Sequence, residues 1–348
     1  MFDFEVASRN FIVIFISILW EAMPFIVLGA VIAGILEELV PQQLVVKVIP
    51  RSRVLAIAIG GLLGLLFPMC ECGIIPVMRR LLRKGVPLSC CVCYLLAGPI
   101  INVVVMLSTW VAFSGMDAPE GGSLRYGHQW GGPGMTGMRM ALGYLVAFGT
   151  SLVVEWQYRK HGSRLLAPLA VADTSAGLAR ADNGDAEEEE EVLPGITAPR
   201  RSAFQRLATI AETALHDFVD ITVFLILGAL LAALVRVLIS PEKIADYGRD
   251  QPVAAIAIMM GLAIVLCLCS EADAFVAASF KTLLPTAKLA FLVLGPMLDF
   301  KLYMMYTRVF RPRLIWTIII SVLVQVSIYA LVTHFIWEAY VRQRYGSP

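Results

Sequence analysis

The sequence predicts an all-α membrane protein that crosses the bilayer several times. Of its 348 residues, 58% are hydrophobic and only 16% are charged. A soluble protein of this length would need more charged surface. Several apolar stretches reach the roughly 20 residues that a helix needs to cross a bilayer. They lack the alternation of a β-barrel, and an open sheet cannot lie in lipid.

Six segments are expected to span the membrane: Phe11–Leu36, Leu88–Phe113, Met138–Val154, Phe218–Ile239, Leu289–Tyr306 and Leu314–Ile336. We expect the first to be retained, because an acidic start and a long apolar run are not typical of a signal peptide. The shorter segment Val54–Phe67 covers about 21 Å at 1.5 Å per residue, too little to cross alone. It either turns back as a re-entrant hairpin or continues through Ile74–Leu82 as one broken helix.

A polar segment separates two hydrophobic parts. Between Arg159 and Asp217 the residues are small, polar and charged, and they include the run Glu187–Glu191. This composition is typical of a disordered linker, with the glutamates acting as a solvated tether. The expected organisation is a first transmembrane repeat at 1–158, a polar acidic linker at 159–215 and a second transmembrane repeat at 216–348.

The two hydrophobic parts carry the same landmarks in the same order. The matched residues lie 197 to 200 positions apart: Phe25 and Phe224, Gly29 and Gly228, Pro41 and Pro241, Gly61 and Gly261, Cys70 and Cys267, Cys72 and Cys269, Gly98 and Gly295, Pro99 and Pro296, Asn102 and Asp299. Such a steady offset indicates an internal duplication.

The orientation of the two copies depends on the short segment. A re-entrant hairpin gives three crossings per copy and inverted copies, whereas a broken helix gives four crossings and parallel copies. Region 47–84 carries seven basic residues and its counterpart 243–288 carries four, diluted by acids. The last connection of each copy has the opposite bias. In the second copy it carries Arg308, Arg311 and Arg313 without acids, whereas in the first copy Arg125 and Arg139 lie beside acids. This exchange favours inverted repeats with the linker in the cytoplasm.

Polar residues accompany a helix break in each copy. Pro68 and Gly73 bracket the first break, in FPMCECGIIP, and LCLCSEADAF holds the second. Interrupted helices at membrane depth are a pointer to a transport site, since irregular backbone survives there only beside protein or a water-filled cavity. The candidate solute- or ion-binding residues are Cys70, Glu71, Cys72, Asn102, Cys267, Cys269, Ser270, Glu271, Asp273 and Asp299.

Structural explanations compete with a functional one for several of these residues. Each charged side chain inside a membrane costs roughly 2.5–3.5 kcal/mol. Glu71, Glu271 and Lys301 could therefore lie near the interface or pair with one another. Asn102 and Asp299 follow Gly-Pro kinks, which either free a carbonyl for an ion or serve packing alone. A further near-matched acidic pair, Glu21 and Asp220, lies in the opening spans.

The cysteines indicate a class of solute. Thiolates prefer soft centres such as Cu(I) or trivalent arsenic and antimony. In Cys-Glu-Cys, the glutamate between two thiols could accept their protons. A fixed metal site is not expected, because no histidine lies near the cysteine clusters.

The segments FPMCECGIIPVMRRLLRKGVP, LLAGPIINVVVMLSTWVAF, CSEADAFVAASF and LGPMLDFKLYMM resemble the predicted-permease family that includes the organoarsenical efflux permeases. The resemblance covers both hydrophobic halves. It implies a multi-pass permease of the bacterial inner membrane, and some family members export trivalent organoarsenicals.

The expected function is secondary transport, with export of a small thiophilic solute. We expect neither an enzyme nor a cofactor, and no Walker A pattern is present to hydrolyse ATP. The drive would be an ion gradient, such as protons, or a partner subunit. Homo-oligomers are compatible with the sequence, whereas a net charge of +1 gives no case for nucleic-acid binding.

Two other functions compete with transport. A membrane thiol-redox protein would use the spacing Cys90-x-x-Cys93. If the chain were a membrane scaffold that transports nothing, the carboxylates in its spans would have no evident function.

Overall fold

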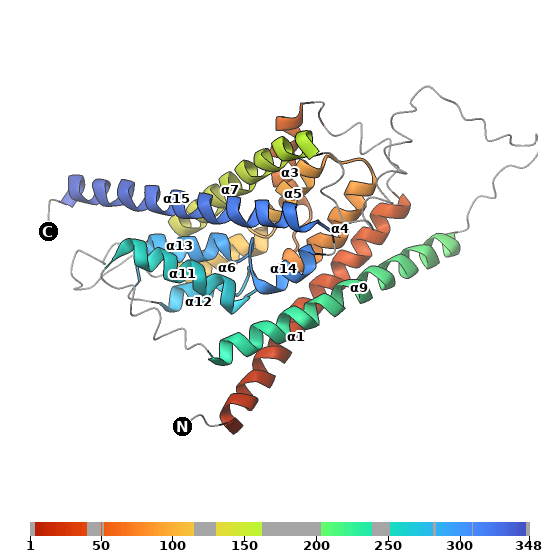
Figure 1. Ribbon diagram of the computed structural model, residues 1–348, viewed down its shortest axis with the longest axis horizontal. Coiled ribbons are helices and arrows are strands. Elements are labelled where there is room, and N and C mark those ends of the chain that lie inside the picture. Colours follow the sequence, from red (N-terminus) through yellow and green to blue (C-terminus); the bar gives the residue numbers. More distant parts are fainter. Residues whose placement is uncertain are drawn as a thin grey trace, which may run out of the picture.

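The computed structural model describes residues 4–39, 50, 52–114, 130–161, 203–238, 251–280, 283–307 and 309–345. These residues form helices, several of which lie side by side (Figure 1). The helices are α1 (Phe4–Leu39), α3 (Arg53–Leu66), α4 (Glu71–Arg83), α5 (Leu88–Ala97), α6 (Val103–Phe113), α7 (Gly132–His161), α9 (Ala203–Leu238), α11 (Pro252–Leu266), α12 (Asp273–Ser279), α13 (Pro285–Leu294), α14 (Phe300–Tyr306) and α15 (Pro312–Tyr345).

Four helices in the described part of the chain are long and apolar enough to cross a membrane. The apolar stretches are Ser8–Leu36 in α1, Gly132–Lys160 in α7, Ala208–Leu234 in α9 and Pro312–Ala339 in α15. Each helix leaves large apolar side chains uncovered, such as Trp20, Val219 and Ile320. Lipid would cover such a surface, so the prediction of a helical multi-pass membrane protein is confirmed.

The four long helices form two antiparallel pairs. In the first pair, Gly34 of α1 packs against Ile210 of α9, whereas Ile18 packs with Ala232. Because contacts near the end of α1 fall near the start of α9, these helices run in opposite directions (Figure 1).

The second pair is α7 and α15. Near the middle of both helices, Gln325 Nε2 donates to Thr150 Oγ1 at 2.9 Å. Trp130, just before α7, meets Trp337 near the end of α15 with ring centroids 5.4 Å apart. The start of α7 therefore lies beside the end of α15.

Two predicted spans are interrupted, which corrects their expected continuity. Leu88–Phe113 consists of α5 and α6, and Leu289–Tyr306 falls within α13 and α14. Pro99 and Pro296 lie in the two gaps, directly after Gly98 and Gly295, which still have right-handed helical dihedrals, and proline offers no backbone N–H to continue the helix. Each half-helix is shorter than the roughly 20 residues that a crossing needs, so none of the four crosses a bilayer alone.

The segment α3–α4 is a hairpin. The Glu155 carboxylate of α7 accepts from Arg53 Nη1 at the start of α3 and from Ser89 Oγ at the start of α5, both at 2.9 Å. The entry to α3 and the entry to α5 therefore lie on the same side of the molecule.

Glycines show the direction of α3 relative to α5. Gly60 faces Cys90, and Gly64 faces Gly98, so α3 and α5 run in parallel. The intervening α4 must return in the opposite direction. Of the two alternatives for the short apolar segment, the geometry is that of a re-entrant hairpin.

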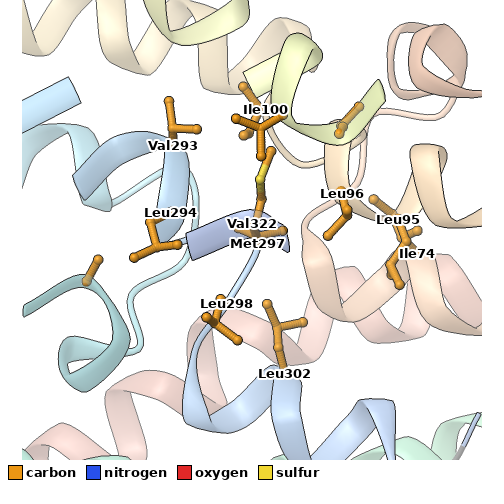
Figure 2. Packing of buried hydrophobic residues seen from close by; sticks show 14 of the residues in the cluster. Ile74, Leu95, Leu96, Ile100, Val293, Leu294, Met297, Leu298, Leu302 and Val322 are labelled. Atoms are coloured by element: carbon orange, nitrogen blue, oxygen red, sulfur yellow. The ribbon is translucent and has the colours of Figure 1, made fainter. Parts of the chain in front are cut away.

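The two halves of the chain share one core. Side chains of α4, α5 and the first Gly-Pro gap meet those of α13, α14, α15 and the second gap (Figure 2). Ile74 and Ile100 from the first half, and Met297 and Leu302 from the second, are fully buried in this cluster. The two Gly-Pro gaps are thus enclosed by protein, which is what irregular backbone requires at membrane depth.

Three further expectations concern segments between the spans. Helix α9 begins at Ala203, so residues 203–215 are helical where a polar linker was predicted. Residues 162–202 of that linker, with the run Glu187–Glu191, lie outside the described residues, as does Arg125 of the last connection. Arg139, counted as a residue of the last connection, lies within α7 and is 1% exposed.

Replacing Gly29 by alanine should destabilise the fold. Gly29 of α1 touches Gly73 of α4, and an added Cβ would overlap the Gly73 carbonyl oxygen and lie 2.8 Å from its Cα. We expect a loss of about 1–3 kcal/mol from overpacking. Thermal unfolding of the purified protein in detergent measures it.

Gly137→Ala is the matched control. Gly137 lies in α7, and no described atom lies within 4 Å of its added Cβ. Alanine favours a helix over glycine by about 1 kcal/mol, so this variant should be neutral or stabilised. Equal melting temperatures for both variants would contradict the close α1–α4 contact.

Candidate functional site

The two helix breaks, one from each half, meet at a cavity of about 50 Å³. Its polar lining consists of Ser17, Glu21, Cys70, Cys72, Cys267, Cys269 and Lys301. A water molecule needs about 10–15 Å³ on this measure, so the cavity has room for a few water molecules or one small solute. The structure thus places four of the ten predicted site residues around one space.

The first break follows from its prolines. Phe67 precedes Pro68 and leaves the helical region, with φ −118° and ψ 83°, so α3 ends there. Cys70 is then the N-cap of α4, and its carbonyl accepts from Gly73 N at 3.1 Å and Ile74 N at 3.3 Å. Pro76 within α4 has no N–H, which deprives the Cys72 carbonyl of its helical partner.

The second break has a different cause. Cys267 ends α11 in the left-handed region, at φ 48°. This conformation is strained for a residue other than glycine, and such strain often marks functional sites. Two residues later, the Cys269 carbonyl accepts from Ala272 N and Asp273 N, both at 3.0 Å. The Cys269 carbonyl therefore accepts the same pattern of backbone hydrogen bonds as the Cys70 carbonyl, although Ala272 is the N-cap of α12.

Three soft or anionic donor atoms converge between the breaks. The sulfurs of Cys70 and Cys269 and a carboxylate oxygen of Glu71 all lie within 4.8 Å of one another. All three side chains are buried. Two thiols and a carboxylate form a donor set suited to a soft, thiophilic centre.

Lys301 supplies a positive charge to this cavity. Its Nζ lies 2.8 Å from Glu71 Oε1 and 3.7 Å from Asp299 Oδ2, and the side chains of all three residues are at most 3% exposed. Glu71 lies in the first half and the other two residues in the second. A buried carboxylate is tolerated when it is paired in this way.

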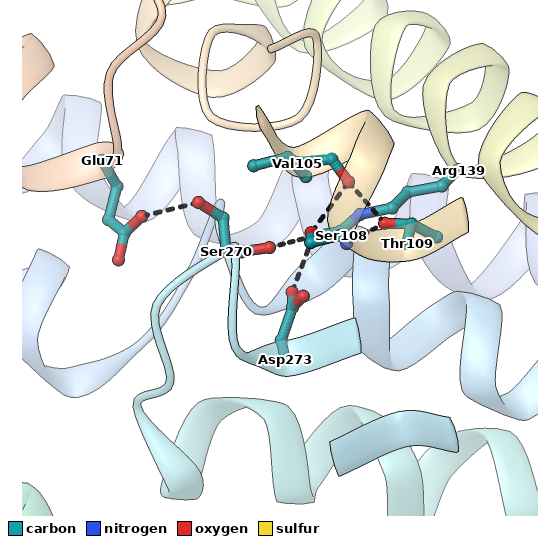
Figure 3. A network of polar contacts seen from close by, with 7 residues as sticks. All are labelled: Glu71, Val105, Ser108, Thr109, Arg139, Ser270 and Asp273. Atoms are coloured by element: carbon teal, nitrogen blue, oxygen red, sulfur yellow. Dashed lines mark hydrogen bonds and ion pairs between the residues drawn. The ribbon is translucent and has the colours of Figure 1, made fainter. Parts of the chain in front are cut away.

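A second polar network lies beside the first (Figure 3). Arg139 of α7 donates through Nη2 to Asp273 Oδ2 at 2.7 Å and to the Ser270 carbonyl at 3.0 Å. Its Nη1 donates to Thr109 Oγ1 at 2.8 Å. Ser270 Oγ in turn donates to Glu71 Oε2 at 3.4 Å, which joins the two networks.

The site has more carboxylates than cations. Acidic side chains at the cavity and its networks are Glu21, Glu71, Glu271, Asp273 and Asp299, against Lys301 and Arg139. In the described part of the chain, buried oxygens of Glu271, Asp273 and Asp299 have no hydrogen-bond partner. A proton, a bound cation or an ordered water molecule would satisfy buried oxygens of this kind.

Asn102 and Asp299 have a local role that the sequence did not predict. Each is the N-cap of the half-helix after a Gly-Pro gap: Asn102 accepts from Val104 N at 2.9 Å, and Asp299 accepts from Leu302 N at 2.6 Å. Asn102 also donates to the Met69 carbonyl at 3.5 Å, within the first break. Neither residue lines the cavity.

Lys301, Arg139 and Glu21 are charged residues of the site that sequence reasoning did not include among the candidate site residues. An arginine at the second position of the apolar stretch Met138–Val154 was the available signal. Glu21 was matched with Asp220, but the two differ in place: Glu21 lines the cavity, whereas Asp220 lies 3.7 Å from Arg79.

The remaining cysteines serve packing. Cys90, Cys91 and Cys93 are buried in α5. A Cβ on Gly60 would lie 2.8 Å from Cys90 Sγ, and one on Gly61 would lie 3.1 Å from Cys93 Sγ, so these sulfurs fill the interface with α3. They do not line the cavity, so the geometry does not favour the thiol-redox alternative.

Comparison with known proteins gives a consistent result. A protein family described as "Predicted permease" (ArsP_1) matches residues 8–335. UPF0718 protein YcgR of Bacillus subtilis (strain 168) is 34% identical over 312 residues, covering 89% of this chain and 92% of that protein. A Streptococcus mutans protein named "Putative two-component membrane permease complex subunit" is 30% identical over 321 residues, covering 92% and 93% respectively. No solved structure matches.

Proposed function

This chain belongs to the predicted permease family, and we propose that it exports a small thiophilic solute, such as a trivalent organoarsenical or a related soft metalloid, across the bacterial inner membrane. The observation that carries the proposal is the convergence of four buried cysteines, two from each helix break, on one cavity. Thiols are the protein ligands that prefer such centres.

The small volume of the cavity limits the solute. At about 50 Å³, it has room for a few heavy atoms in the state described. A trivalent arsenical with a methyl substituent suits this space better than one with an aromatic ring. Larger solutes would require the breaks to move apart.

We further propose that the chain is a pair of inverted repeats joined by the acidic linker. Three features support this: the matched helices α1 and α9 are antiparallel, α7 and α15 are antiparallel, and α3–α4 is re-entrant. The hydrogen bond between Ser270 and Glu71 joins residues 199 positions apart, within the range of 197 to 200 that separates the matched residues. Inverted repeats with a site at their interface are a common plan of secondary transporters.

The proposed drive is an ion gradient, with protons as the coupling ion. The carboxylate oxygens of Glu271, Asp273 and Asp299 without hydrogen-bond partners in the described residues would take up and release this ion. A partner subunit is the other source of drive, since one relative is named as a complex subunit. In that case, the subunit that supplies the energy would be a separate protein chain.

Transport into everted membrane vesicles tests the proposal. Vesicles from an arsenic-sensitive bacterial host expressing the chain are supplied with monomethylarsenite, and trapped arsenic is measured by mass spectrometry. We expect accumulation above empty-vector vesicles and its loss when a protonophore is added. Accumulation that equals the empty-vector level would contradict the export of this solute class.

A further inference from the structure

Lys301 lies beside a group of three possible metal ligands. The three donor atoms of Cys70, Glu71 and Cys269 lie within 4.8 Å of one another. The Lys301 ammonium is already 2.8 Å from Glu71 Oε1 and lines the same cavity as both sulfurs. A metal cation that used Glu71 Oε1 together with both sulfurs would compete with this ammonium for the carboxylate oxygen.

The surrounding helices hold Lys301 in this position. Gly228 of α9 packs so closely against it that an added Cβ would lie 2.7 Å from the Lys301 Cα. Asp299 caps α14 and lies 3.7 Å from the ammonium. The Lys301 side chain is only 3% exposed, so it has no solvent-facing position to move to without a rearrangement.

We propose that Lys301 occupies a latent soft-cation site and so makes the cavity select neutral thiophilic solutes over metal cations. This inference rests on the proposed function, because it assigns the residue that determines the specificity of the same site.

The two classes of solute make different demands on Glu71. A neutral arsenical carrying two hydroxyl groups can react with two thiols: two As–O bonds break, two As–S bonds form, and the thiol protons leave with the hydroxyl groups as two water molecules. No charge changes, so the Lys301–Glu71 pair can stay intact. A divalent cation instead displaces two protons from the thiols and still requires a third donor, which Lys301 holds.

Cadmium binding by the purified full-length chain tests this assignment. Cd²⁺ is titrated into the wild type, Lys301→Met and Lys301→Arg, and the cadmium–thiolate charge-transfer absorbance is recorded. We expect Lys301→Met to bind Cd²⁺ about tenfold more tightly than the wild type, or better, and Lys301→Arg to behave as the wild type. Adding Cys70→Ser to Lys301→Met should remove the gain.

Lys288→Met is the matched control, because Lys288 is equally buried but does not line the cavity. It should leave Cd²⁺ affinity unchanged. If Lys301→Met does not fold, the same Cd²⁺ titration is carried out on Lys301→Gln, whose neutral amide can still donate a hydrogen bond to Glu71. Equal Cd²⁺ affinity in the wild type and the folded neutral variant would overturn the assignment.

The outcome separates this inference from the proposed function. A gain of Cd²⁺ binding in the neutral variant, with no arsenical transport by the wild type, would leave Lys301 as the selector and refute the solute. Arsenical transport by the wild type without any gain in the neutral variant would refute the role of Lys301 alone.

Discussion

Replacing Arg139 by methionine should destabilise the protein by about 3–5 kcal/mol, the usual effect of breaking a buried ion pair. The substitution would leave Asp273 buried without the guanidinium that lies 2.7 Å away. It would also remove donors from Thr109 and from the Ser270 carbonyl. Denaturant unfolding of the purified protein in detergent measures the change.

Two variants make this prediction specific. Asp273→Asn in the Arg139→Met background removes the unpaired charge and should recover a large part of the loss. Arg159→Met is the matched control on the same helix, because Arg159 also pairs with a carboxylate but its side chain is 65% exposed. An exposed pair contributes at most about 1 kcal/mol. If Arg139→Met is no worse than Arg159→Met, the buried network does not stabilise the fold as described.

Changing Cys70 and Cys269 together to serine should abolish export of the arsenical. Serine keeps the shape of cysteine but offers a hard oxygen, which binds thiophilic centres poorly. Because one sulfur comes from each break, we expect either single change to reduce transport strongly as well. Arsenic accumulation in everted vesicles is the measurement.

Cys90→Ser with Cys91→Ser is the control for this double change. Both residues are buried in α5 and neither lines the cavity. Export by the control, corrected for its expression level, should equal export by the parent protein. Export by the Cys70→Ser, Cys269→Ser variant at the parental rate would show that the thiols do not contact the solute.

Three buried or nearly buried ion pairs connect the two halves of the chain. They are Arg139–Asp273, Lys301–Glu71 and Arg80–Asp217, the last at 2.6 Å. Alternating access requires one half to move against the other around the site. These pairs would therefore have to break or exchange partners during transport, which links the buried charges to the conformational cycle.

The sequence predicted the helices and the breaks because both depend on local chemistry. Apolar length indicated the spans, and Pro68 with the nearby cysteines indicated the first break. It did not predict that Pro99 and Pro296 would split two spans into half-helices, although the Gly-Pro pairs were evident. Local signals mark where a helix is weakened, but packing decides whether it kinks or ends.

The partners of the site residues could not be predicted in the same way. Lys301 and Glu71 are 230 positions apart, and Arg139 and Asp273 are 134 apart. No periodicity in one segment encodes a contact of that kind. The sequence matched Cys70 with Cys267, whereas in the structure it is Cys269 whose carbonyl accepts backbone hydrogen bonds from residues i+3 and i+4, as the Cys70 carbonyl does.

Disulfide cross-linking tests the central claim, that the breaks of the two halves form one thiol cavity. A variant retaining only Cys70 and Cys269, with a protease site engineered between the halves, is oxidised in the membrane and then cleaved. We predict that the halves stay joined on a non-reducing gel and separate after reduction. In a control variant that retains only Cys91 and Cys269, the halves should separate even without reduction. Halves that separate in the Cys70, Cys269 variant as readily as in that control would contradict the shared cavity.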